Sequence, residues 1–312
     1  MWRCLIFAAG VLALASLLRA DPEAMTPPTT RLVIGPFPAV YTDKLTTTPH
    51  FYQRDPRWGL TIAGENYCVP TSISDSMVYF ANIGFDRLLP ADNPDRYLAQ
   101  AELINKLASS GYMATNPDTG TSPGGALHGI RRYVEENGYI CERLEYAGWR
   151  VLPKQLRKSA VASHPDLDWI KTCVADPSGT AWLEIGFYVH GDSPGVWRRM
   201  TGHTVVAVGY GTDGARLDGH IFIVDNPAIG PQVPAAPAER AAGRKWRPIT
   251  LADQAITLTP VGPLKLLLQN AKAPRDVDGL FQISGPGVPF SHKKYDVAYL
   301  DGAIVLVVGQ NP

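Results

Sequence analysis

The sequence predicts an α+β fold in which N-terminal helices pack on a C-terminal antiparallel sheet. In the first half, apolar residues recur at the spacing of amphipathic helices. After Pro177 the chain changes to runs rich in β-branched and aromatic residues, separated by Gly, Asp and Pro. Helices and strands therefore occupy different parts of the chain, whereas a parallel α/β fold would alternate them.

The first residues have the pattern of a secretory signal peptide. A basic start at Arg3 precedes an apolar run from Cys4 to Leu18, and small residues fit cleavage after Ala15 or Ala20. The run is shorter than the ~20 residues that cross a membrane. We therefore predict a signal peptide over 1–20, a secreted or periplasmic protein, and no membrane association beyond the signal.

The segment over 21–49 is a Pro/Thr-rich leader that contains a strand-like "RLVIGPF". It is followed by a predicted main domain over 50–230 and by a loop and β-rich extension over 231–312. We expect the extension to pack on the same domain.

Three helices are predicted in the first half of the main domain. The first covers 71–81 and has Pro70 in its first turn, where a helix tolerates proline. The second has Asn93 as its cap and ends before Gly111, and the third runs from "TSPGG" to Gly138.

Three strands are predicted after the helices, in "TAWLEIGFYV" (180–189), "HTVVAVGYG" (203–211) and "HIFIVDNP" (220–227). The later runs "DQAITLTPVGPLKLLL", "GLFQIS" and "AIVLVVG" either extend the same sheet or form a small appendage. The sequence leaves both arrangements open.

The charge pattern argues against nucleic acid as a partner. Loss of Arg3 and Arg19 with the signal leaves 27 basic side chains from 29, against 29 acidic ones, and no basic stripe is present. The chain also lacks an HExxH pair, a CxxC pair and a glycine-rich phosphate loop. We therefore expect no metal and no cofactor.

Three cysteines follow the signal, at 68, 141 and 173. Because cysteines tend to pair in an oxidising compartment, Cys141 and Cys173 are candidates for a disulfide that would leave Cys68 as a free thiol. Closing a loop of about 30 residues would contribute about 3–4 kcal/mol to stability.

Cys68 is the first candidate catalytic residue, because it directly precedes the first predicted helix. The unpaired N–H groups and the positive end of the dipole at a helix N-terminus favour a thiolate. A nearby imidazole would complete the activation. The alternative is an inert cysteine packed as a small apolar residue.

His203 is the candidate imidazole, since it opens a strand, although His190 and His220 lie near strand ends too. The run "IFIVDNP" ends in Asp225 and Asn226, either of which could orient that imidazole, or simply form a turn. In "FYQRDPRWG", Gln53 has an amide that could help to bind an oxyanion.

Taken together and in this order, these segments resemble the papain-like cysteine peptidases. They are most similar to the bacterial branch akin to the leader-peptide-processing peptidases of bacteriocin exporters. The matching segments are "YQRDPRWG", "YCVPTSISDSMVYF", "GTSPGGALHGIRRYVEENGY", "GHTVVAVGYG" and "FIVDNP". The resemblance covers about residues 50 to 227 and implies a papain-like fold.

The resemblance also implies roles for individual residues. Cys68 would be the nucleophile, His203 the general base and acid, and Gln53 the oxyanion donor. Asp225 and Asn226 remain alternatives for the orienting residue, since adjacent strand residues point to opposite faces. Val69 departs from the glycine that usually follows the family's cysteine, which puts the oxyanion geometry in question.

We expect a secreted thiol hydrolase that cleaves a peptide or amide bond in a peptide or protein substrate. Trp197, on a predicted loop before His203, is a candidate wall of the substrate cleft. One alternative is a catalytically silent module of the same fold that binds peptides or has a structural role. Another is an acyltransferase that uses the same nucleophile.

Overall fold

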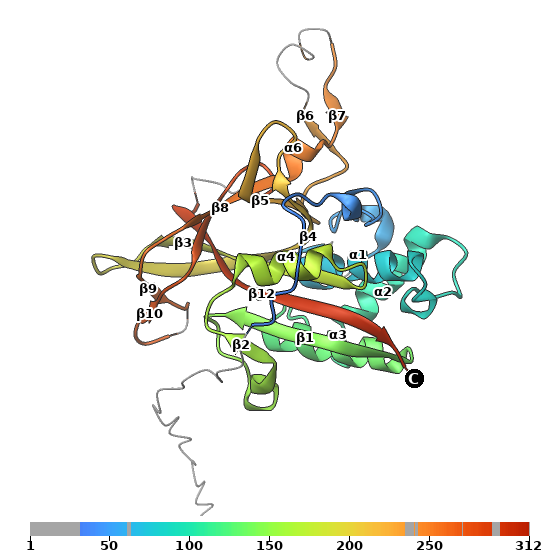
Figure 1. The fold of residues 1–312 in the computed structure, drawn as a ribbon, viewed down its shortest axis with the longest axis horizontal. Helices are drawn as coiled ribbons and strands as arrows, with labels where there is room; N and C mark the ends of the chain where they lie inside the picture. Colours follow the sequence, from blue (N-terminus) through green and yellow to red (C-terminus); the bar gives the residue numbers. More distant parts are fainter. Residues whose placement is uncertain are drawn as a thin grey trace, which may run out of the picture.

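The computed structural model describes residues 32–60, 64–234, 240, 243–269, 271–288 and 294–311, and the predicted signal peptide lies outside this range. The described residues form a mixed α+β fold built on one large sheet (Figure 1). Within these ranges, no helix has the length and apolar character needed to cross a membrane.

The helices predicted for the first half are confirmed. They are α1 (Cys68–Asn82), α2 (Arg96–Ala108) and α3 (Pro123–Glu136), and the later helices are α4 (Leu167–Ala175) and the single turn α6 (Leu251–Gln254). Short 3-10 helices lie at Asp43–Leu45, Pro56–Trp58, Asp86–Leu88 and Lys154–Ser159.

The predicted cap of the second helix was misplaced by two residues. The side chain of Asp95 accepts from the backbone of Tyr97 and Leu98 and so caps α2, whereas Asn93 accepts from Asp95 N–H. The third helix has the expected start, because Ser122 accepts from Gly125 N–H and Pro123 occupies the first turn.

The strands of the described residues form one 10-stranded sheet and one small two-stranded sheet. The large sheet contains β1 (Tyr139–Gly148), β2 (Ala160–Ala162), β3 (Gly179–His190), β4 (Val196–Thr212), β5 (Leu217–Asp225), β8 (Ala255–Pro260), β9 (Leu264–Leu267), β10 (Arg275–Val277), β11 (Phe281–Ser284) and β12 (Val297–Gln310), and the small one contains β6 (Gln232–Pro234) and β7 (Trp246–Pro248).

The large sheet is mixed, so the prediction of an antiparallel sheet was too simple. Most neighbouring strands are antiparallel, but β1–β2 and β4–β9 are parallel pairs. The order along the main path is β10-β9-β4-β5-β8-β11-β12-β1-β2. Because β3 pairs with both β4 and β12, the strands from β4 through β5, β8 and β11 to β12 close a circuit.

The later predicted strands of the C-terminal segment belong to the large sheet, whereas β6 and β7 of the same segment form the separate two-stranded sheet. Strand β12 lies between β1 and β3, and β8 pairs with β5 (Figure 1). Of the two arrangements that the sequence left open for the later runs, the described strands β8 to β12 therefore extend the same sheet.

The sheet has a core on each of its faces. On β3, Trp182 packs in the cluster with α1 and α3, and its neighbours Ala181 and Leu183 pack in the cluster with α4. Figure 1 shows α4 in front of β12 and α3 behind β1. Near-complete burial on both faces explains why these strands are apolar at almost every position.

The leader is held to the core by a buried lysine and forms no strand over 32–37, where one was predicted. Pro36 has no N–H to donate to a ladder. Further along, Lys44 Nζ donates to the carbonyls of Val174, Asp176 and Gly179 at 2.7, 2.6 and 2.7 Å, and burial lowers the Lys44 pKa to about 7. These three bonds tie the leader to the C-terminal end of α4.

Candidate active site

Cys68 is the first residue of α1 and lies at the junction of this helix with β4. Its side chain is half-buried and its thiol is free. The Ser72 hydroxyl, one turn further along α1, donates to the Thr204 carbonyl at 3.0 Å and so fixes the helix against the strand. The helix start therefore has a defined position relative to the residue before Thr204, which is His203.

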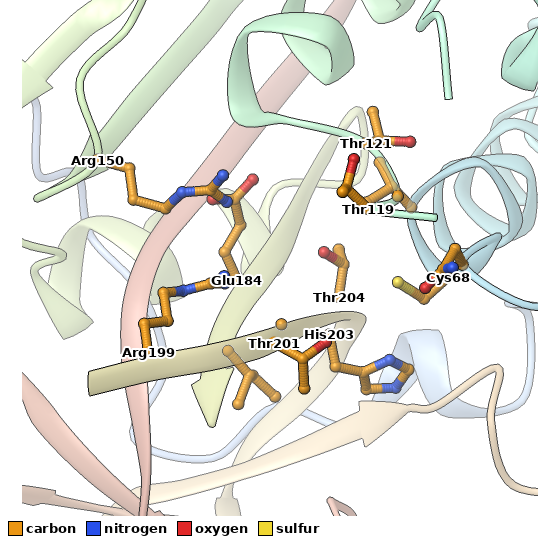
Figure 2. A pocket seen from close by; sticks show the side chains of 14 residues that line it. Cys68, Thr119, Thr121, Arg150, Glu184, Arg199, Thr201, His203 and Thr204 are labelled. Carbon is orange, nitrogen blue, oxygen red and sulfur yellow. The ribbon is translucent and has the colours of Figure 1, made fainter. Parts of the chain in front are cut away.

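Cys68 and His203 line the same cavity, of about 60 Å³ (Figure 2). Figure 2 shows the Cys68 sulfur and the His203 ring projecting from α1 and β4 into a common space. Their remaining neighbours in the wall include Val69, Thr121, Gly202 and Thr204. The two sequence-predicted residues, far apart in the chain, are thus brought together.

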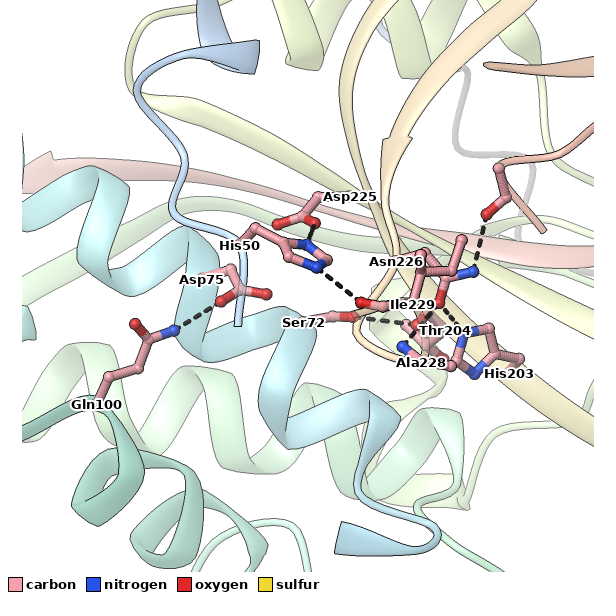
Figure 3. A network of polar contacts seen from close by, with 11 residues as sticks. His50, Ser72, Asp75, Gln100, His203, Thr204, Asp225, Asn226, Ala228 and Ile229 are labelled. Carbon is pink, nitrogen blue, oxygen red and sulfur yellow. Dashed lines mark hydrogen bonds and ion pairs between the residues drawn. The ribbon is translucent and has the colours of Figure 1, made fainter. Parts of the chain in front are cut away.

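Asn226 orients the His203 ring. Asn226 Oδ1 lies 2.6 Å from His203 Nε2 and also accepts from Ala228 N–H at 2.9 Å, while Asn226 Nδ2 donates to the Gly287 carbonyl at 2.8 Å (Figure 3). These bonds fix the amide orientation, so Oδ1 must be an acceptor and Nε2 must carry the proton. In the neutral ring, Nδ1 is then the basic atom.

The environment of the pair favours its uncharged form. Burial raises the pKa of the Cys68 thiol, although the N–H groups of Thr204, Val69 and Cys68 itself oppose this effect. Burial also lowers the pKa of His203, against the effect of the hydrogen bond to Asn226. The resting site is therefore a thiol beside a neutral imidazole, whereas helix position alone had suggested a thiolate.

Asp225, the alternative orienting residue, lies on the opposite side of the strand end and does not reach this cavity. It forms an ion pair with His50 Nδ1, and His50 Nε2 lies 2.7 Å from the Ile229 carbonyl (Figure 3). Asp225 and His50 line a different cavity, of about 250 Å³. The structure therefore assigns the orienting position to Asn226 and excludes Asp225 from it.

Gln53 is buried beside the site but does not line the cavity. Its Nε2 donates to the Gly64 carbonyl at 2.9 Å, and its Oε1 is a buried atom with no hydrogen-bond partner among the described residues. The amide expected to bind an oxyanion is therefore engaged with the turn before α1. Its second N–H remains for another acceptor.

Val69 is accommodated without backbone strain. It lies in the first turn of α1, it is not among the described residues with positive φ, and its side chain packs in the core. A glycine is not needed at this position, because a helical φ suits any L-residue.

Trp197, the candidate wall of the cleft, is not among the residues that line the cavity of Cys68 and His203. It packs on His190, with ring centroids 4.1 Å apart, and on Tyr299, with centroids 6.1 Å apart. A β-bulge lies between Trp197 and His203, since Phe187 pairs with Thr201 whereas Tyr188 pairs with Arg199. The bulge alone does not exclude Trp197, because Arg199 shares its face of the strand and lines the cavity.

The disulfide between Cys141 and Cys173 is absent, and both thiols are free. Cys141 packs with the cluster that includes α1 and α3, and Cys173 packs with the cluster around α4. Because these clusters cover opposite faces of the sheet, the two sulfurs cannot meet without unfolding.

Three charged residues of the cavity wall were missed by sequence reasoning, namely Arg150, Glu184 and Arg199. Glu184 had a visible signal, because it is a single acid inside the apolar run "TAWLEIGFYV". A charge in a strand buried on both faces requires a special environment. The arginines carried no comparable signal.

The described part of the chain contains no group of three or more His, Cys, Asp or Glu side chains arranged to hold a metal ion.

Comparison with known proteins adds no relative to this picture. No family model matches the chain, and no curated protein or solved structure is significantly similar to it.

Proposed function

We propose that this protein is a secreted, papain-like thiol hydrolase that cleaves a peptide or amide bond. Cys68 is the nucleophile, His203 the general base and acid, and Asn226 the residue that orients His203. The single observation that carries the proposal is the shared cavity of Cys68 and His203, in which Asn226 leaves Nδ1 as the basic atom of the ring. A helix that presents a cysteine to a histidine on a sheet also supports the papain-like assignment.

The reaction begins with a neutral pair. His203 Nδ1 takes the proton of the Cys68 thiol as sulfur attacks the substrate carbonyl carbon. The Cys68 N–H, which has no intrahelical acceptor at the start of α1, donates to the developing oxyanion. We assign the second donation to the Gln53 amide, whose side chain must rotate away from Gly64 to reach the cavity.

Collapse of the tetrahedral intermediate breaks the carbon–nitrogen bond, and the imidazolium gives its proton to the leaving amine. A water molecule then attacks the thioester while His203 takes the water proton. The acid product leaves, and the thiol recovers its proton from His203. The cycle consumes one water and needs no other reactant.

A second candidate function is favoured by two observations, namely the small volume of the cavity and the engagement of Gln53 with Gly64. A silent module of the same fold would bind peptides in the adjoining groove without cleaving them. This groove has a volume of about 500 Å³ and shares Arg150 and Thr201 with the cavity.

Turnover of a peptide mixture separates the two functions. The protein is incubated at neutral pH with a library of unstructured peptides, and new termini are identified by mass spectrometry. Hydrolysis predicts products that disappear in Cys68→Ala and persist in Cys141→Ala, the matched control with a free, half-buried thiol. Peptides that are retained by the protein but never cut would establish the silent module instead.

A further inference from the structure

The wall of the cavity opposite the reactive pair is charged. Figure 2 shows Arg150, Glu184 and Arg199 on one side and Cys68 and His203 on the other. All five side chains line the same cavity of about 60 Å³. Whatever carbonyl group reaches the sulfur must bring its neighbouring atoms against this wall.

Arg199 is held rigidly in that wall. Its Nε donates to Asp301 Oδ2 at 2.6 Å, and Asp301 also accepts from Trp149 Nε1 at 3.0 Å and from the Tyr188 hydroxyl. A Cβ at position 202 would lie 2.2 Å from Arg199 Nη2, so a residue larger than Gly202 would displace the guanidinium from this position. The fixed guanidinium still has N–H groups beyond Nε to offer to a ligand.

Glu184 is buried in the same wall and incompletely bonded. It is 4% exposed, and its Oε2 is a buried atom without a hydrogen-bond partner among the described residues. Burial raises the Glu184 pKa to about 7, although Arg150 and Arg199 act in the opposite direction. Near neutral pH, part of the population therefore carries a carboxylic acid that can donate a hydrogen bond.

We propose that Arg150, Arg199 and the protonated form of Glu184 bind a carboxylate of the substrate, close to the scissile bond. Guanidinium groups match a carboxylate in shape and charge, and a carboxylic acid adds a third donor. The substrate is then a peptide with an acidic side chain, or with a free terminal carboxylate, next to the bond that is cut. The assignment rests on the proposed function only in placing the reacting carbonyl at Cys68.

A cationic substrate group fits this wall less well. It would gain one carboxylate only when Glu184 is ionised, and it would face two guanidinium groups at all times. The arginines also line the adjoining groove of about 500 Å³, together with Asp118, whereas Glu184 lines only the inner cavity. A substrate chain in the groove therefore passes both guanidinium groups before it reaches the sulfur.

Two small alkylating reagents test the subsite directly. Iodoacetate and iodoacetamide differ only in a carboxylate and its neutral amide, and both label Cys68. Mass spectrometry gives the rate constant of each reagent at Cys68. The measured ratio is the rate constant for iodoacetate divided by that for iodoacetamide, and it is normalised by the same ratio for N-acetylcysteine. Because thiol ionisation affects both reagents equally, it cancels in the ratio.

Arg150→Gln should lower this ratio by about tenfold, the usual effect of losing one charge-assisted hydrogen bond. Arg131→Gln, at a helix-surface arginine that lines neither cavity, should leave the ratio unchanged. Arg54, which lies near His203, also attracts anions and stays in place in both variants. An unchanged ratio in Arg150→Gln overturns the proposal.

Glu184 is tested by the pH dependence of the same ratio. Preference for iodoacetate should decline as the pH rises through about 7, because Glu184 loses its proton, and Glu184→Gln should remove most of this decline. An identical decline in wild type and Glu184→Gln contradicts a role for Glu184. The ionisable groups around Glu184 are Arg150, Arg199, Asp301, Tyr146 and Cys68, with His203 in the same cavity.

Peptide protection identifies the source of the carboxylate. Peptides with a central Asp or Asn, each with a free or an amidated C-terminus, compete with iodoacetamide for Cys68. Protection by the amidated Asp peptide indicates a side-chain carboxylate, and protection only by peptides with a free C-terminus indicates a terminal one. Stronger protection by a central Lys peptide overturns the proposal.

These outcomes are separable from the proposed function. If alkylation depends on His203 but the ratio is unchanged in Arg150→Gln, the hydrolase proposal stands and the carboxylate subsite is wrong. If alkylation is independent of His203, the hydrolase proposal fails regardless of the ratio.

Discussion

Asp225 and Asn226 are consecutive residues at the end of β5, yet they serve different histidines on opposite sides of the strand (Figure 3). Asn226 offers a neutral acceptor to His203, and burial lowers the pKa of that ring. Asp225 offers a carboxylate to His50. Burial lowers the His50 pKa too, but the hydrogen bond and charge of Asp225 outweigh it, so the His50 pKa is raised.

The difference shows how one partner atom decides the function of a buried histidine. An amide orients the ring and leaves it neutral, which a general base requires. A carboxylate favours the protonated ring, which suits an anchor between the leader and the core. We accordingly expect substitutions at the two histidines to have opposite consequences.

The largest expected effect is on turnover. His203→Ala should lower kcat/KM by about 10²–10⁴, the usual contribution of a positioned acid–base group. His50→Ala should leave the activity of the folded protein close to that of wild type. Steady-state kinetics on a cleaved peptide measure both, and equal losses in the two variants would remove the distinction between the sites.

The next effect is on stability, where substitution of His50 should cost more than substitution of His203. His50→Ala leaves Asp225 buried without its cation, and we expect a loss of about 3–5 kcal/mol in the free energy of unfolding. Urea denaturation provides the value. His128→Ala, at an exposed position of α3, is the control and should lose far less. A fully stable His50→Ala protein would show that the ion pair is not an anchor.

A pH-dependent effect should appear at Asp75, which lies near Asp225. Burial, with a further contribution from the Asp225 charge, raises the Asp75 pKa well above 3.8. The folded protein therefore keeps a proton on Asp75 that the unfolded chain releases above pH 3.8. The contribution of this proton to stability is complete below pH 3.8 and is lost as the pH rises through the folded pKa.

Asp75→Asn copies the protonated form and should escape this loss. The stability of the variant relative to wild type should grow with pH, at no more than about 1.4 kcal/mol per pH unit. Urea denaturation between pH 4 and 8 measures the difference. A constant difference over that range would mean that Asp75 is ionised in the fold.

The smallest effect is expected at Asn226. Asn226→Ala removes one hydrogen bond to the catalytic ring. We expect the activation free energy to rise by about 1–3 kcal/mol, which lowers kcat/KM by roughly 5–150-fold. Asn226→Asp offers a sharper comparison, because a carboxylate should raise the His203 pKa toward the behaviour of His50. A pH–rate profile shifted to higher pH would support this reasoning, and an unshifted one would oppose it.

The sequence predicted the helices and the pairing of Cys68 with His203, because both depend on local signals and on motif order. It could not choose between Asp225 and Asn226, since "IFIV" is apolar on both sides and β5 is buried on both faces at its end. Local pattern carries no information on which face meets the thiol.

Other errors came from long-range geometry. Trp197 packs on His190 and Tyr299, and no local pattern indicated these contacts. The proposed disulfide failed because its cysteines belong to clusters on opposite faces of one sheet. The position of Arg199 depends on its ion pair with Asp301 of β12, a partner that no local pattern could indicate.

The central claim is that His203 activates the thiol of Cys68, and iodoacetamide alkylation of that residue between pH 6 and 9 tests it most directly. We predict that the rate at neutral pH falls at least about tenfold in His203→Ala and stays unchanged in His50→Ala. The same rate in wild type and His203→Ala across this range would contradict the account.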